Sequence, residues 1–157
     1  MSVNNLADGA ESAEMHLHVV ASLLRRGKAV DYLSTGMTLL GLALGLSQLW
    51  IIAPGLPLTL CVAFIVLCGL AEKYYGLRVA FDADLFSILA QDISRTAEMD
   101  LALSALRLQP VDKSGRSWAL RSQGALALLR RQILFAALQL LSMLSAFFIL
   151  PWLPIAH

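Results

Sequence analysis

Long uncharged runs of apolar residues dominate the pattern of this chain. The first two, about 33–53 and 56–71, flank a Pro-Gly-Leu-Pro turn sequence, and a third covers about 132–150. A helix needs roughly 20 apolar residues to cross a hydrocarbon core of about 30 Å, and soluble helices rarely need such a run. The pattern predicts an all-α polytopic membrane protein with three transmembrane helices, the first two forming a tight hairpin.

The segment before the first span, 1–32, has the pattern of an amphipathic helix. Apolar residues recur at steps of three to five up to about Arg26, and Gly27 offers a break before the span. We expect this helix to lie on the membrane surface or to pack against another cytosolic helix. Its predicted apolar face consists of Met15, Val19, Val20, Leu23 and Leu24.

The segment between the second and third spans, 72–131, is the only large polar part of the chain. Its pattern predicts a helix from Tyr75 to about Leu108, a loop around Pro110 and a further amphipathic stretch before the third span. We expect these helices to form a cytosolic layer, and residues 151–157 to form an external tail. The predicted apolar stripe of the long helix consists of Leu77, Phe81, Leu85, Ile88, Leu89 and Ile93.

Composition and cysteine usage agree with a single membrane domain. Of the 157 residues, 58 % are hydrophobic and 15 % charged, and the mean hydropathy is +0.70. Soluble domains have roughly 45–50 % apolar and about 25 % charged residues. Cys61 and Cys68 are seven residues apart on one predicted helix, about 10 Å by its rise, which is too far for a disulfide. The polar leader differs from a signal peptide.

The charges predict an orientation. All twelve Lys and Arg residues precede the first span or lie between Lys73 and Arg131. The positive-inside rule places both regions on the cytoplasmic side. We therefore expect a cytoplasmic N-terminus and an external C-terminus, which is periplasmic in the bacterial inner membrane that we favour for so short a chain. The net charge of +1 gives no indication of nucleic-acid binding.

Three residues are candidates for helix packing. Gly41 and Gly45 form a GxxxG pair, which lets another helix backbone approach closely. That helix belongs either to the same chain, which we favour, or to a second copy. Gln139 is level with Gly41 in this topology and is predicted to hydrogen-bond a carbonyl beside the glycine groove. The alternative for Gln139 is a polar lining for a pore made by several copies.

The sequence predicts no catalytic, cofactor or metal site. His16 and His18 point in different directions on a helix, and His157 lies across the membrane from them. Nucleotide-binding and hydrolase motifs are absent from the sequence. We also expect no ionisable side chain inside the bilayer, with Glu72 at the membrane edge and Asp31 paired with the nearby Lys28.

A cluster of residues before the third span is a candidate lipid-headgroup contact, although we favour simple anchoring of the span at the inner interface as its role. The cluster consists of Trp118, Arg121, Arg130 and Arg131.

The favoured function is that of a non-enzymatic membrane protein acting by association. It is expected to bind itself or another membrane protein within the lipid bilayer, as an accessory or scaffold subunit or as a homo-oligomer, and to bind no nucleic acid. The alternative is an oligomeric pore or channel. A third, less favoured hypothesis is an enzyme acting on lipid at the inner interface.

Overall fold

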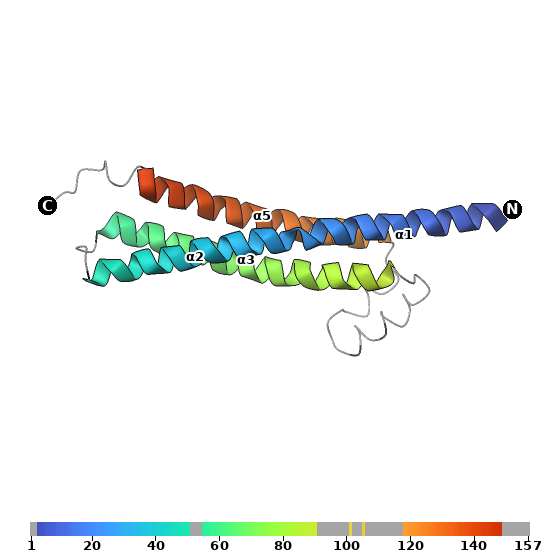
Figure 1. Cartoon of the computed structure of the whole chain (residues 1–157), viewed down its shortest axis with the longest axis horizontal. Coiled ribbons are helices and arrows are strands. Elements are labelled where there is room, and N and C mark those ends of the chain that lie inside the picture. Colours follow the sequence, from blue (N-terminus) through green and yellow to red (C-terminus); the bar gives the residue numbers. More distant parts are fainter. Residues whose placement is uncertain (1–2, 51–54, 91–100, 102–104, 106–117, 149–157) are drawn as a thin grey trace. The chain divides into compact units, whose positions relative to one another are not determined.

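The computed structural model describes residues 3–50, 55–90, 101, 105 and 118–148, with side chains described from Glu14 in the first range and from Leu120 in the last. The regular structure of these residues is helical throughout. It comprises α1 (Val3–Arg25), α2 (Gly27–Trp50), α3 (Leu56–Leu89) and α5 (Trp118–Phe148), which are labelled in Figure 1. The all-α prediction is confirmed for this part of the chain.

Three described stretches are long and apolar enough to cross a membrane. They are Glu14–Trp50, Leu56–Leu89 and Leu120–Phe148. The 34 residues of α3 make a helix about 51 Å long at 1.5 Å per residue. That length exceeds a hydrocarbon core of about 30 Å, so part of α3 extends beyond such a core. The predicted hairpin turn is 54–57. Pro54 lies outside the described residues, whereas Leu56 and Pro57 belong to the first turn of α3.

The length of α3 differs from the predicted elements. The pattern suggested a span ending near Ala71 and a separate helix starting at Tyr75, whereas α3 continues through Glu72 without interruption. Glu and Lys are good helix formers and no proline intervenes, so a change of polarity does not end the helix. Beyond Ala90, the described part of the expected 75–108 helix is limited to residues 101 and 105.

The contacts divide the chain into two units, which are described separately. Unit 1 combines Met1–Arg25 with Val79–Ala127, and unit 2 combines Arg26–Arg78 with Leu128–His157. Helices α3 and α5 therefore contribute residues to both units.

The core of unit 1 corrects the predicted apolar face of α1. Met15, Val19 and Leu23 are 65 %, 51 % and 41 % exposed. The buried face of α1 combines Val20 and Leu24, as predicted, with two residues outside the predicted stripe, Leu17 and Ala21. The helix is apolar on two sides, and its buried side includes the small Ala21, which lets neighbouring helices approach closely.

The predicted stripe of α3 is wrong in the same way. Phe81 and Ile88 are 46 % and 54 % exposed, and Leu77, in unit 2, is 76 % exposed. Leu89 alone of the predicted stripe is fully buried among the described residues. The buried residues of α3 in unit 1 are Val79, Ala83, Phe86 and Leu89.

Unit 2 is a bundle of α2, α3 and α5. Helices α2 and α3 run antiparallel, because Asp31 contacts Lys73 while Gln48, further along α2, contacts Thr59, earlier in α3. Helices α2 and α5 run in the same direction. Gln132 of α5 contacts the first residue of α2, and Gln139, seven residues later, contacts Ser34.

The inner face of α2 combines the buried Met37 with small and polar residues that are spaced alternately by four and three. This spacing is typical of helices that pack side by side over several turns. The outer face is apolar, with large exposed side chains such as Leu39, Leu42, Leu46 and Leu49. A helix with apolar residues outside and polar residues inside suits a lipid environment. The small and polar residues of the inner face are Gly27, Asp31, Ser34, Thr38, Gly41, Gly45 and Gln48.

Candidate functional site

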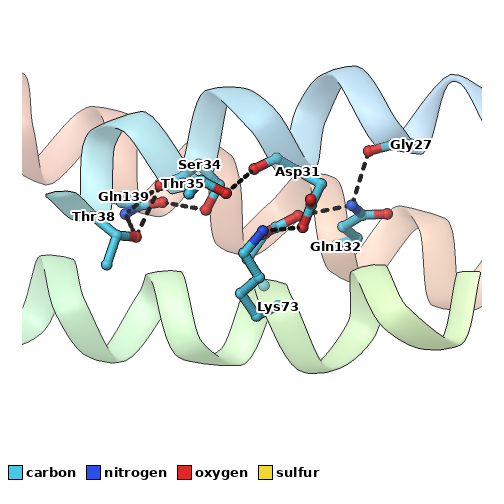
Figure 2. A network of polar contacts seen from close by, with 9 residues as sticks. Gly27, Asp31, Ser34, Thr35, Thr38, Lys73, Gln132 and Gln139 are labelled. Atoms are coloured by element: carbon cyan, nitrogen blue, oxygen red, sulfur yellow. Dashed lines mark hydrogen bonds and ion pairs between the residues drawn. The ribbon is translucent and has the colours of Figure 1, made fainter. Parts of the chain in front are cut away.

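Polar side chains from all three helices of unit 2 meet between these helices (Figure 2). They form two groups. One is centred on Glu72 and Gln132, and the other on Gln139. Gln132 and Gln139 are seven residues apart on α5, which corresponds to about 10 Å along the helix axis.

Glu72 is the most unusual residue of the first group, because its carboxylate is completely buried, at 0 % exposure. Its Oε1 accepts a hydrogen bond from Gln132 Nε2 at 2.7 Å. The same nitrogen donates to the carbonyl oxygen of Gly27 at 3.0 Å. One amide of α5 thus binds both α2 and α3. Among the described residues, Glu72 Oε2 and Gln132 Oε1 have no hydrogen-bond partner.

Burial of Glu72 differs from its expected position at the membrane edge. The prediction assumed that a charged residue following an apolar run turns toward headgroups and water. Glu72 instead lies on the inner face of α3, three residues after the buried Gly69 and four before the buried Gly76. The structure therefore places an ionisable side chain inside the bundle.

Asp31 pairs with Lys73, not with Lys28 as the sequence suggested. Lys73 Nζ lies 2.6 Å from Asp31 Oδ1, and the two side chains are 44 % and 31 % exposed. Asp31 occupies an inner position of α2 and faces α3, whereas Lys28 is on the exposed side of α2. The helix packing, and not the sequence separation, decides the partner.

Gly76 provides the space in which the first group converges. A Cβ atom at Gly76 would lie 3.0 Å from Gln132 Nε2, 3.2 Å from Asp31 Oδ1 and 3.4 Å from Glu72 Oε1. Polar atoms of α2, α3 and α5 therefore approach one point. The carboxylates of Asp31 and Glu72 share this space, and Lys73 Nζ binds Asp31 Oδ1.

The second group is centred on Gln139, which is fully buried. Its Oε1 accepts a hydrogen bond from Ser34 Oγ at 2.7 Å. Its Nε2 donates to Thr38 Oγ1 at 2.8 Å and to the Ser34 carbonyl oxygen at 3.3 Å. A methyl group at Gly69 would overlap Thr38 Oγ1 and lie 2.9 Å from Gln139 Nε2. The absence of a side chain at Gly69 therefore makes room for this network.

The two glycines of the GxxxG pair face α3 of the same chain. A Cβ atom at Gly41 would lie 2.8 Å from Ile65 Cγ2, and one at Gly45 would lie 3.0 Å from Val62 Cγ1. Gln48, one turn further on, accepts a hydrogen bond from Thr59 Oγ1 at 3.0 Å. Gln48 and Gln139 thus bind different partners.

The candidate lipid contacts are divided between the two units. Arg130 and Arg131 belong to unit 2 and are exposed. Arg121 belongs to unit 1 and is partly exposed. Trp118 begins α5, and its side chain lies outside the described residues. In unit 1, His16 Nε2 lies 3.4 Å from Ser122 Oγ.

Sequence reasoning missed Glu72 and Gln132 as members of one site. The available signal was the spacing of small and polar residues. Glu72 lies three residues after Gly69 and four before Gly76, and Gln132 lies seven residues before Gln139. In a membrane helix, small and polar residues at this spacing indicate the packed face. A single carboxylate beside a run of apolar residues looked instead like the end of a span.

The chemistry of the site is that of hydrogen bonding and charge. Within the described ranges, no three His, Cys, Asp or Glu side chains are grouped so that they could hold a metal ion. Comparisons with models of protein families, with curated proteins and with solved structures find no match to this chain.

The Asp31–Lys73 pair is expected to contribute little to stability. Exposed ion pairs contribute about 0.2–1 kcal/mol, because water screens them and both side chains lose freedom. Lys73→Gln should therefore lower the free energy of unfolding by less than about 1 kcal/mol. Unfolding of the chain in detergent, followed by circular dichroism, measures this. A loss several times larger would show that Lys73 also balances the charge of Glu72.

Proposed function

We propose that this chain is a three-span membrane protein that acts by associating with a further membrane protein or with a second copy, and not by catalysis. The proposed association rests on a single observation, the exposed apolar stripe of α1. Met15, Val19 and Leu23 lie four residues apart on one side of that helix and are at least 41 % exposed. Such a stripe is typical of a helix that packs against a partner.

The polar residues of unit 2 support the three spans. The large side chains that α2, α3 and α5 expose there are mainly leucine, isoleucine and phenylalanine. Gln132 and Gln139 are buried and bonded within the chain. In lipid, polar groups need internal partners of this kind, because no water is available to replace them.

The basic residues of unit 2 support a cytoplasmic N-terminus. Six Lys and Arg residues belong to this unit, and each lies within six positions of Gly27, Glu72 or Gln132. Hydrogen bonds link those three residues, so the cations gather around one level of the bundle. By the positive-inside rule this level faces the cytoplasm, and an inner membrane of a bacterium fits it.

In this topology the α1 stripe lies in a cytosolic helical layer, before Arg25 and Arg26. A stripe of three exposed apolar side chains there is not covered by lipid tails. In the same topology, a hairpin joins the first two spans.

A pore made by several copies is less well supported. It would require polar side chains on the outer faces of the spans. The amides that motivated this hypothesis, Gln48 and Gln139, are 6 % and 0 % exposed and are bonded inside the chain. We therefore favour association without conduction.

A photo-crosslinking amino acid at Val19, in intact membranes, tests the association. We expect a discrete crosslinked product, whose mass identifies either a second copy or another protein. The matched control is the same amino acid at His18, an exposed neighbour on a different side of α1. Equal products from both positions, or none from Val19, would contradict an interface on the stripe.

A further inference from the structure

The buried carboxylate of Glu72 requires a compensating charge. Transfer of an ionised carboxylate from water into a protein interior is strongly unfavourable unless the charge is paired. Glu72 is 0 % exposed and receives one hydrogen bond, from the neutral amide of Gln132. A single amide does not neutralise a full negative charge.

The formal charges of Glu72 and its charged neighbours add up to one negative charge. Asp31 of α2 and Glu72 of α3 carry two carboxylates, and their Oδ1 and Oε1 atoms approach the same point beside Gly76. Lys73 supplies one positive charge, and its Nζ is bound to Asp31 at 2.6 Å. From α5, the facing group is the uncharged Gln132. One further positive charge makes this cluster neutral.

Two buried oxygen atoms are available to bind such a positive charge. Among the described residues, Glu72 Oε2 and Gln132 Oε1 lack hydrogen-bond partners although both side chains are at least 99 % buried. Nearly all buried polar atoms in folded proteins have partners, so an unpartnered pair indicates a missing interaction. An ionisable residue between membrane-spanning helices is in addition typical of ion and proton sites.

We propose that the Glu72 carboxylate, with Asp31 beside it, binds one small monovalent cation, an alkali-metal ion. The charge of the cluster accounts for the valence, since a divalent ion would leave an unbalanced positive charge. Asp31 and Lys73 are partly exposed and give the cation a route from solvent. Because Gln132 binds both Glu72 and the start of α2, cation binding strengthens the packing of the three helices.

Thermal unfolding of the full chain in detergent, at varied pH and varied Na⁺ or K⁺ with choline holding the ionic strength constant, tests the proposal. A cation that binds only the folded chain lowers the unfolding equilibrium constant by up to tenfold for each tenfold rise in its concentration. We expect a response to Na⁺ or K⁺ at fixed pH, and a chain that responds to pH alone would overturn the proposal.

Two variants make the test specific. Glu72→Gln keeps an oxygen acceptor for Gln132 and removes the charge, so the cation response should disappear. Glu14→Gln removes a charge from an exposed position and should keep the wild-type response. An equal response in Glu72→Gln and wild type, or no response in wild type, would overturn the proposal.

A third variant keeps the proposal testable if Glu72→Gln does not fold. Asp31→Asn acts at a position that is partly exposed, and it leaves the cluster neutral without a cation. We expect the apparent affinity for the cation to fall at least tenfold. An unchanged affinity would contradict the participation of Asp31 and the charge argument on which the site depends.

Discussion

Gln132→Leu is expected to lower the free energy of unfolding by about 2–4 kcal/mol, because it leaves a buried carboxylate without its donor. The leucine also leaves the Gly27 carbonyl oxygen without the amide that now binds it. Chemical unfolding of the chain in mixed micelles measures the loss. Gln123→Leu, the same substitution at an exposed position of α5, is the matched control and should change stability by less than about 0.5 kcal/mol.

A double-mutant cycle shows whether the loss comes from Glu72. Removing both partners of a buried polar pair leaves neither partner unsatisfied, and is often close to neutral. Glu72→Leu together with Gln132→Leu should therefore be more stable than Gln132→Leu alone. Simple addition of the two single effects would show that the Glu72–Gln132 hydrogen bond does not couple α3 to α5.

Gly69→Ala is expected to destabilise the bundle by about 1–3 kcal/mol, the usual consequence of forcing extra volume into a packed interior. The new methyl group would overlap Thr38 Oγ1 and lie 2.9 Å from Gln139 Nε2. Thr38 is a short side chain whose hydroxyl is bonded to the Ser34 carbonyl oxygen, so it cannot move aside without breaking hydrogen bonds.

Gly36→Ala is the matched control for Gly69→Ala. Both glycines lie within helices, but a Cβ atom at Gly36 would have no heavy atom within 4 Å. Alanine is the better helix former by about 0.5–1 kcal/mol, so Gly36→Ala should leave stability unchanged or raise it. Equal effects of the two substitutions on the thermal midpoint would show that the α2–α3 contact at Gly69 is loose.

The sequence alone determined the helical class and the number of membrane-capable helices. Runs such as 33–53 and 132–150 are long and uncharged, and a hydrocarbon core of fixed thickness makes run length decisive. A break in the helix near Gly27 was also predictable, because glycine is a poor helix former, and α1 ends at Arg25 while α2 begins at Gly27. These properties depend on local composition, which tertiary contacts do not change.

The tertiary structure alone decided which face of each helix is inside. On α1, the predicted face included Met15, Val19 and Leu23, which are exposed, and missed Leu17 and Ala21, which are buried. Spacing of three and four residues describes both faces equally well when a helix is apolar on two sides. The choice depends on which side chains fit against the neighbouring helices, and spacing along one helix does not specify that fit.

The partners of the polar residues were likewise a tertiary result. Asp31 has Lys28 nearby in sequence, yet it pairs with Lys73, 42 positions away. Glu72 follows an apolar run, yet it is bonded to Gln132, 60 positions away. The sequence states that these residues are charged or polar and gives their spacing. Only the packing of α2, α3 and α5 determines which of them meet, because direction and rotation of each helix are set by its neighbours.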